Sequence, residues 1–260
     1  MMAWKVLAES VSGTSHQRTS LPCQDANHHA QIRIDEETVL IAICADGAGS
    51  AELSQIGSKV ACQRFFDLAY EALQTRSTLD FLDREILLGW YEKVREAISV
   101  EALTRGVPAR QLACTMLTAI VGDERAWFAQ VGDGSIVFRS GETYESAFWP
   151  QVGDYANTTN FVTQSELADV FECSEHVARI DELALFTDGL QRLALDFSAR
   201  RVHTQFFAPM FSSLRSAEEA DSLVVPLRGF LDSPQVNERT DDDKTLILAT
   251  RLDSDGPRSA

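Results

Sequence analysis

Short apolar runs near the start of the chain predict strands. They cover Trp4–Ser10, Ala30–Ile34 and Val39–Ala45, and turn-prone sequence around Gly13 and Pro22 separates the first two. Runs of this length that are bounded by turn residues are more typical of strands than of helices. The chain is therefore expected to open with a set of strands.

Two long helices are expected after these strands. The first covers Leu53–Gln74, where the small residues Gly57, Ser58 and Ala61 would allow close packing on a sheet. The second runs from near Asp80 to Leu103, because apolar side chains recur there at helical spacing. Those side chains are Leu87, Tyr91, Val94, Ile98 and Ala102.

Strand-like sequence returns after the second helix. Leu112–Val121 and Ala126–Val131 flank a short charged turn, which predicts a hairpin, and Ser135–Arg139 predicts a further strand. Residues 141–177 show little periodicity and are expected to form loops with one short helix near Ser165–Phe171.

The final third predicts a strand at Leu183–Thr187, a helix at Ala220–Leu231 and a closing strand at Thr245–Thr250. Strands and helices do not alternate strictly along the chain, which favours an α+β fold with helices covering a largely antiparallel sheet system. One domain over residues 1–252 is expected, since 260 residues suit a single large core better than two small ones. Residues 253–260 are small and polar and are predicted to be a disordered tail.

Charge and cysteine content narrow the classes of function. The formal net charge is −16 and the pI is about 4.7, which opposes binding to nucleic acid or to an anionic membrane surface. The five cysteines are odd in number and form no C-x-x-C pair, so a reducing compartment is expected. No signal peptide and no long apolar run is present, and the sequence predicts a cytoplasmic protein.

Aspartates stand where several strand-like runs give way to glycine or turn sequence. They are Asp46, Asp133, Asp188 and the group Asp241–Asp243, and Asp25 adds a further carboxylate near the start. A single Asp-Gly is a common turn dipeptide, and each one alone is better explained by structure. Several carboxylates in one cleft would repel one another unless a cation neutralised them. Their recurrence therefore predicts a site for Mg²⁺ or Mn²⁺, which prefer hard oxygen ligands.

The order of these motifs resembles the PP2C (PPM) family of metal-dependent protein serine/threonine phosphatases, and in particular its bacterial single-domain branch. The matching motifs are Gly13-Thr14-Ser15-His16, Pro22-Cys23-Gln24-Asp25, Asp46-Gly47-Ala48-Gly49, Ala113-Cys114-Thr115, Val131-Gly132-Asp133, Phe186-Thr187-Asp188-Gly189 and Asp242-Asp243-Lys244-Thr245. Ordered motifs over almost the whole chain are far more specific than any one of them. The resemblance implies a four-layer αββα sandwich of two antiparallel sheets flanked by helix pairs, with the metal cleft at one end.

The resemblance also implies roles for individual residues. Asp46 would bridge two metal ions, and Gly47 would offer its backbone carbonyl to one of them. Asp188 and Asp242 would complete the ligands of the other ion, and Asp133 would help to hold a third. Asp25 would hold a metal-bound water. Two such ions about 3.5–4 Å apart would turn a shared water into a hydroxide for in-line attack on phosphorus, so no protein nucleophile is needed.

The sequence departs from the family pattern on the substrate side. Gln24 stands where many members have a glutamate, and Ala48 stands where some have a histidine that protonates the leaving group. The family's phosphate-binding arginine has no match. His16 occupies its position and Arg18 is the nearby alternative, so these two residues are the candidate substrate contacts.

Structural interpretations remain open beside these roles. His16 is equally well explained as a turn residue, and Thr115 and Thr187 as strand residues that satisfy their hydroxyls locally. Asp241 and Asp243 are interpreted as solvent-facing partners of Lys244 or Arg239, although a one-residue slip from Asp242 would exchange their roles.

The sequence as a whole predicts a Mn²⁺- or Mg²⁺-dependent phosphatase that acts on phosphoserine and phosphothreonine in proteins. The expected partners are a phosphorylated protein substrate and a cognate serine/threonine kinase, with no nucleic acid and no membrane. Two alternatives remain: a non-catalytic regulator of the same fold that binds a phosphoprotein, and a small-molecule phosphohydrolase.

Overall fold

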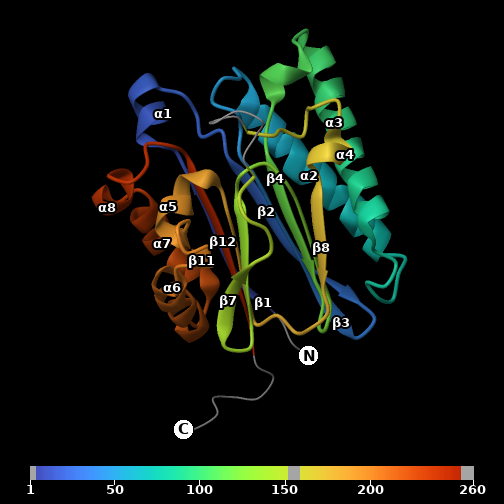
Figure 1. Ribbon diagram of the computed structural model, residues 1–260, viewed down its shortest axis with the longest axis vertical. Coiled ribbons are helices and arrows are strands. Elements are labelled where there is room, and N and C mark those ends of the chain that lie inside the picture. Colours follow the sequence, from blue (N-terminus) through green and yellow to red (C-terminus); the bar gives the residue numbers. More distant parts are fainter. Residues whose placement is uncertain (1–3, 152–158, 253–260) are drawn as a thin grey trace.

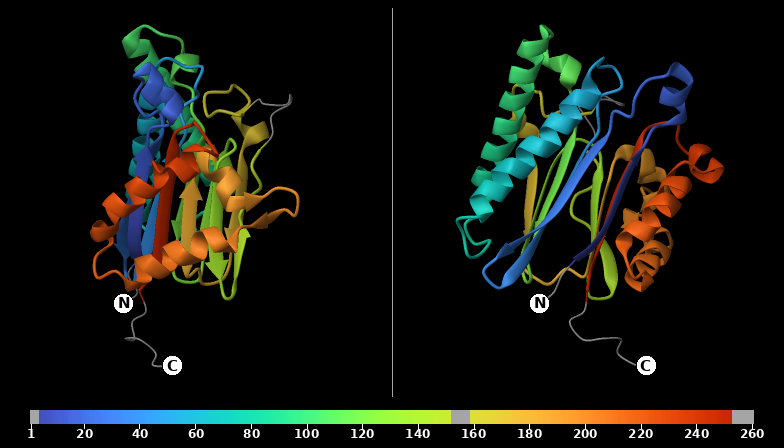
Figure 2. Two further views of the ribbon diagram at one scale, coloured as in Figure 1. Left: turned by 90° about the vertical axis from the view of Figure 1, so that its left-hand side faces the viewer. Right: turned by 180° about the vertical axis from the view of Figure 1, so that it is seen from behind.

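The computed structural model describes residues 4–151 and 159–252, which form two packed sheets with helices on both outer faces (Figure 1). The view from behind shows the same four layers, with one helix pair on each side of the sheets (Figure 2). The α+β, αββα sandwich implied by the resemblance is therefore confirmed. The predicted tail, residues 253–260, lies outside the described residues.

One sheet is covered by the two long helices of the first half. Its five antiparallel strands are, in spatial order, β2 (Ala26–Ile34), β3 (Glu37–Ala45), β4 (Met116–Val121), β5 (Ala126–Val131) and β8 (Glu172–His176). The helices on its outer face are α2 (Ser54–Leu73) and α3 (Arg84–Arg105).

The second sheet contains both the first and the last strand of the described chain. Its five antiparallel strands are β1 (Trp4–Val11), β12 (Lys244–Arg251), β9 (Glu182–Phe186), β6 (Ser135–Ser140) and β7 (Thr143–Ser146), again in spatial order. Helices α6 (Thr204–Ser216) and α7 (Val224–Leu231) cover its outer face. The last strand thus lies between the first strand and β9.

Strand β3 is apolar on both of its faces because both are buried in the sandwich. Leu40, Ala42 and Cys44 point into the layer between the sheets, and the alternate residues Ile41 and Ile43 point towards α2 and α3. All five are fully buried, so neither face of the strand tolerates a polar side chain. A third apolar layer, around Phe207 and Phe211 of α6, lies between the second sheet and its helices.

Shorter elements connect the layers. They are α1 (Thr14–Thr19), the 3₁₀ turn η1 (Ala109–Leu112), α4 (Leu167–Val170), the 3₁₀ turn η2 (Asp188–Leu190), α5 (Gln191–Ala194), β10 (Leu195–Asp196), β11 (Arg201–Val202), the 3₁₀ turn η3 (Ala220–Leu223) and α8 (Pro234–Asn237). Within the described ranges, none of the helices has the length and apolar character needed to cross a lipid bilayer.

Several predicted elements differ from the observed ones. The strand expected at Leu112–Val121 begins only at Met116, because η1 occupies the first position and the intervening residues form an extended connection. The helix expected at Ala220–Leu231 is divided into η3 and α7. Helix α6 was not predicted, and neither was α1, which buries no side chain and so carries no apolar pattern. The region of expected loops contains β7 and β8, two edge strands without a fully buried residue.

Candidate metal centre

The candidate aspartates lie together at one end of the sandwich. Asp46 directly follows β3, Asp188 comes two residues after β9 ends, and Asp242 comes two residues before β12 begins. Asp133 occupies the turn between β5 and β6. In antiparallel sheets the end of one strand meets the start of its neighbour, so these positions share one edge.

Strand register brings Asp25 to the same place. Ala26 pairs with Ala45 in the β2–β3 ladder, so Asp25 and Asp46 occupy the next position beyond the pairing. The Asp25 carboxylate accepts a 2.8 Å hydrogen bond from the Thr187 hydroxyl, which follows β9 in the opposite sheet. Asp25 therefore connects the two sheets at the candidate centre.

Glycines allow the loops to approach this closely. A Cβ on Gly13 would lie 2.3 Å from the carbonyl oxygen of Asp241, and one on Gly189 would lie 2.1 Å from that of Asp243. Both distances are far below van der Waals contact, so any other residue would push the aspartate segment away. The two glycines thus hold the Asp241–Asp243 backbone between the β1 and β9 loops.

Asp46 is held through its backbone and leaves its carboxyl group for the centre. Its N–H donates to the Thr115 hydroxyl at 3.1 Å, and its carbonyl accepts from the Thr115 N–H at 2.8 Å. Burial, and then the negative charges of Asp25, Asp188 and Asp242, raise the pKa of the Asp46 carboxyl well above its usual range. Its side chain is also within hydrogen-bonding reach of Asp188. The next residue, Gly47, is buried and forms an isolated antiparallel bridge with Cys114.

The other carboxyl groups are perturbed in the same direction. Burial raises the pKa of Asp25 to about 8, despite the opposing hydrogen bond from Thr187. Burial, followed by the charges of Asp133 and Asp242, raises the pKa of Asp188 to about 6. Burial also raises the pKa of Asp133, whose carboxylate accepts a 2.7 Å hydrogen bond from Thr159.

Two of these carboxyl groups each leave one oxygen without a hydrogen-bond partner among the described residues. Oδ1 of Asp25 and Oδ1 of Asp188 are buried and have no hydrogen-bond partner in the described part of the chain. Residues 4–151 and 159–252 contain no ready-made set of three His, Cys, Asp or Glu side chains that could by itself hold a metal ion. A cation at this place would need further ligands from water or substrate, as Mg²⁺ commonly does.

The structure distinguishes the three consecutive aspartates. Asp242 is exposed to solvent at the rim, and its charge contributes to the raised pKa values of Asp46 and Asp188. Asp243 is 2% exposed and is not the solvent-facing residue that the sequence predicted. Its carboxylate accepts hydrogen bonds from the Gly13 N–H at 2.6 Å and the Gln24 N–H at 2.5 Å. Asp243 is thus a buried link between two loops that reach the centre.

The candidate substrate contacts lie beside this link. His16 Nδ1 is 2.9 Å from Oδ1 of Asp243, and the His16 side chain is only 12% exposed. Arg18 lies on the surface, where it forms a 3.4 Å ion pair with Asp241 and both side chains are 69% exposed. The structure therefore brings His16 next to the aspartate segment and leaves Arg18 on the outside of α1.

Sequence reasoning missed two residues that support the centre. Thr187 donates to Asp25 and accepts from the Thr245 N–H at 3.0 Å, so its hydroxyl links a candidate catalytic residue to β12. Asp243 was interpreted as a surface partner, although its neighbour Lys244 is itself buried. All eight residues of β12 are buried and the burial continues back to Asp243, so the place of Asp243 directly before this strand was the available signal.

Comparisons with known proteins indicate the family and support the fold. The family described as protein phosphatase 2C matches residues 12–228. "Serine/threonine-protein phosphatase 3" of Escherichia coli (strain K12) is 36% identical over 254 residues, which cover 95% of this chain and 98% of that protein. The catalytic domain of the serine/threonine phosphatase PstP, solved with two manganese ions, is 14% identical with a TM-score of 0.60, covering 97% of this chain and 100% of that one. RsbX, solved with magnesium, is 14% identical with a TM-score of 0.57 at the same coverage.

Proposed function

Because the chain belongs to the protein phosphatase 2C family, we propose that it is a serine/threonine-protein phosphatase that uses Mn²⁺ or Mg²⁺ to hydrolyse phosphoserine and phosphothreonine. The observation that carries the proposal is the meeting of Asp25, Asp46 and Asp188 at one end of the sandwich, where burial raises the pKa of all three. Such carboxyl groups are costly for a metal-free fold and suited to binding a cation.

The donor set fits a hard divalent cation. Oδ1 of Asp25 and Oδ1 of Asp188 are buried and without partners in the described residues, so a cation or its water would satisfy them. PstP and RsbX, which share the fold, were solved with manganese and with magnesium respectively. When bound, such ions would activate a water for in-line attack on phosphorus and neutralise charge on the phosphoryl oxygens.

The roles of the chain's own residues follow from their positions. Asp46 and the Gly47 carbonyl would hold one ion, and Asp46 together with Asp188 and Asp242 the other, with Asp133 available for a third. The two hydrogen bonds of Thr115 hold the Asp46 backbone in place before a metal ion binds. Positioning the Asp46 carboxyl group for the ion therefore costs no further backbone entropy. Thr187 holds one oxygen of Asp25 and leaves the other to orient a water.

His16 is the better of the two candidate phosphate contacts. The Asp243 carboxylate accepts a hydrogen bond from Nδ1 of His16. This bond fixes the orientation of the imidazole ring and leaves Nε2 available for the substrate. Arg18 forms an ion pair with Asp241 on the surface and is therefore the weaker candidate.

The substrate is a phosphorylated protein, and a cognate kinase would be its source. The net charge of −16 opposes binding to nucleic acid and to anionic membrane surfaces, and the odd number of cysteines fits a reducing, cytoplasmic compartment.

A metal-dependence assay tests this proposal. Purified protein is given a chromogenic phosphate ester and then phosphoserine and phosphothreonine peptides, with Mn²⁺, with Mg²⁺ and with chelator. Asp46→Asn removes one carboxylate at constant size and should abolish turnover while the protein stays folded, because it also relieves repulsion in the centre. Asp80→Asn, at an exposed aspartate on the connection between α2 and α3, is the matched control that removes the same charge elsewhere.

Three results would contradict the proposal. Turnover that persists in chelator would remove the role of the metal. Binding of phosphopeptides without turnover would favour the non-catalytic regulator. Hydrolysis of small esters with no activity on any phosphopeptide would favour the small-molecule phosphohydrolase.

A further inference from the structure

A hollow opens on the side of the centre where Ala48 follows Asp46 and Gly47. It has a volume of about 350 Å³ and is lined by Ala48, Ser50, Arg110, Phe161, Thr163 and Gln164, with two further residues of the 110–113 segment. Ala48 and Ala113 are nearly buried and pack with Phe161, so they form an apolar floor. This region is called the Arg110 hollow below.

The Arg110 hollow is rigidly attached to the candidate metal centre. Ala48 N–H donates to the Ala113 carbonyl at 2.9 Å, and Leu53 N–H donates to the Gln111 carbonyl at 2.9 Å. Gln111 also accepts the Glu52 N–H through its side chain at 2.9 Å. These bonds fasten η1, which carries Arg110, to the loop that begins at Asp46, so the position of Arg110 is fixed relative to the centre.

Arg110 carries an uncompensated charge in an otherwise acidic protein. The chain has 39 acidic and 23 basic residues, and arginines such as Arg105, Arg125 and Arg228 each pair with a carboxylate. Arg110 is exposed, and no ion pair, hydrogen bond or ring contact of its side chain occurs in the described part of the chain. A free guanidinium beside an apolar floor and the hydroxyls of Ser50 and Thr163 suits an anionic group on a ligand.

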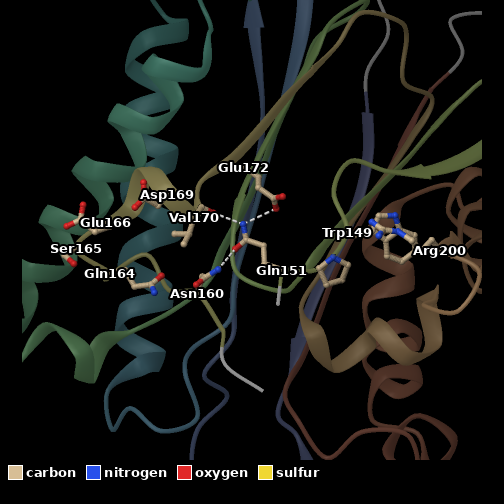
Figure 3. A pocket seen from close by; sticks show the side chains of 11 residues that line it. Trp149, Gln151, Asn160, Gln164, Ser165, Glu166, Asp169, Val170, Glu172 and Arg200 are labelled. Atoms are coloured by element: carbon tan, nitrogen blue, oxygen red, sulfur yellow. Dashed lines mark hydrogen bonds between the residues drawn. The ribbon is translucent and has the colours of Figure 1, made fainter. Parts of the chain in front are cut away.

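The adjoining surface has the opposite charge. A second, larger pocket of about 1020 Å³ shares Gln164 with the Arg110 hollow, and its charged lining residues are three acids, Glu166, Asp169 and Glu172, and one base, Arg200. Figure 3 shows Glu166 and Asp169 on one side of this pocket and Trp149 with Arg200 on the other. An acidic ligand group would therefore be directed to the Arg110 hollow and away from the second pocket.

We propose that Arg110 selects phosphoprotein segments that carry an anionic side chain close to the phosphorylated residue, and that this side chain enters the Arg110 hollow. The inference rests on the proposed phosphatase function and adds a substrate preference to it. The anionic group is a glutamate, an aspartate or a second phosphorylated residue, all of which present oxygens to a guanidinium in the same way.

The test compares peptides that differ only beside the phosphorylated residue. One carries glutamine, two carry glutamate on the N-terminal or C-terminal side, and one carries a second phosphoserine on the side that glutamate prefers. We measure kcat/KM for each, and also the dissociation constant by fluorescence anisotropy in the Asp46→Asn background. Arg110→Met removes the guanidinium, and Arg105→Met is the control that makes the same charge change at the Glu101 pair on α3.

The native protein should prefer one glutamate peptide over the glutamine peptide, and Arg110→Met should reduce that ratio by roughly three- to fivefold, the upper range for an exposed ion pair. Arg105→Met should leave it intact, and the effect should shrink with added salt. The glutamate and phosphoserine peptides identify which anion is preferred.

Two outcomes would overturn the inference. The ratio could be the same in the native protein and in Arg110→Met, or both peptides could lose activity equally in Arg110→Met, which would place Arg110 on the reacting phosphoryl group. If no peptide is hydrolysed at all, the proposed function fails, and the anisotropy ratio still decides whether Arg110 selects an anion.

Discussion

Removal of the Asp243 carboxylate should destabilise the protein far more than its place in an acidic loop suggests. Asp243 accepts the buried N–H groups of Gly13 and Gln24 and is paired with His16. In Asp243→Ala both N–H groups lose their acceptor, and each unsatisfied buried donor costs about 1–3 kcal/mol. Two such donors together cost about 2–6 kcal/mol. We therefore expect the free energy of unfolding to fall by about 3–5 kcal/mol, the middle of this range.

Urea denaturation in the presence of chelator measures this change without a contribution from metal binding. The midpoint of thermal unfolding should fall by roughly 6–20 °C, because 1 kcal/mol corresponds to about 2–4 °C in a protein of this size. Asp241→Ala is the matched control: its carboxylate is exposed and, among the described residues, pairs with Arg18 alone, so its effect should stay within about 0.5 kcal/mol.

A His16→Ala variant and the double variant complete the cycle. Since His16 and Asp243 contact each other directly, the two losses should not add. A loss below about 1 kcal/mol for Asp243→Ala, or one equal to that of Asp241→Ala, would refute the assignment of Asp243 as the buried link between the loops.

Three further outcomes are expected. The raised pKa of Asp25, about 8, means that the folded state prefers the protonated acid, so the stability of chelated protein should fall as pH rises from about 4 to about 8. Asp25→Asn should flatten that slope in urea titrations at several pH values, and a slope equal to the native one would contradict the assignment. Thr187→Val should lower the free energy of unfolding by about 1–3 kcal/mol and lower kcat, because the hydroxyl holds Asp25. Thr187→Ser keeps the hydroxyl and should retain native stability and kcat, and equal kinetics of the two variants would contradict this role. Gly13→Ala should destabilise the protein, because the added Cβ would collide with the Asp241 carbonyl. Gly89→Ala, in open space on α3, should stabilise it by about 0.5–1 kcal/mol, and calorimetry should show shifts of the unfolding temperature in opposite directions for the two variants.

Fully buried strands and long amphipathic helices could be predicted from sequence because packing constrains every position. β3 is apolar on both faces, and α3 begins where the Asp83 side chain accepts the Ile86 N–H. Edge strands lack this constraint. Polar residues fill much of β7 and β8, so their strand character comes from pairing, of β7 with the adjacent β6 in a hairpin and of β8 with β5 far away in the sequence.

Helix α6 was missed for a different reason. Pro209 lies inside it, and proline is normally unfavourable within a helix. Phe207, Phe211 and Leu214 nevertheless recur at helical spacing and are all fully buried against the second sheet. The apolar pattern was present, and tertiary packing outweighed the local preference.

The candidate centre was predictable in composition but only partly in geometry. Aspartates at strand ends indicated a cation site, and the structure brings Asp25, Asp46 and Asp188 together. The depth of each carboxylate depends on which loops cross, and that cannot be deduced from spacing. Asp242 and Asp243 are adjacent in sequence, yet one faces solvent and the other is buried beneath α1.

The central position of β12 has a consequence for synthesis on the ribosome. One sheet can be completed once residue 176 has left the exit tunnel, since all of its strands precede that point. The other sheet has a gap between β1 and β9 until Lys244–Arg251 emerges, and Asp242 and Asp243 appear only just before this strand. Between these two points the nascent chain has one complete sheet, and its set of carboxylates stays incomplete until Asp242 emerges. Phosphatase activity is therefore expected only near the end of synthesis. A premature stop codon a few triplets upstream of β12 would yield a product that lacks both the completed second sheet and the full set of carboxylates.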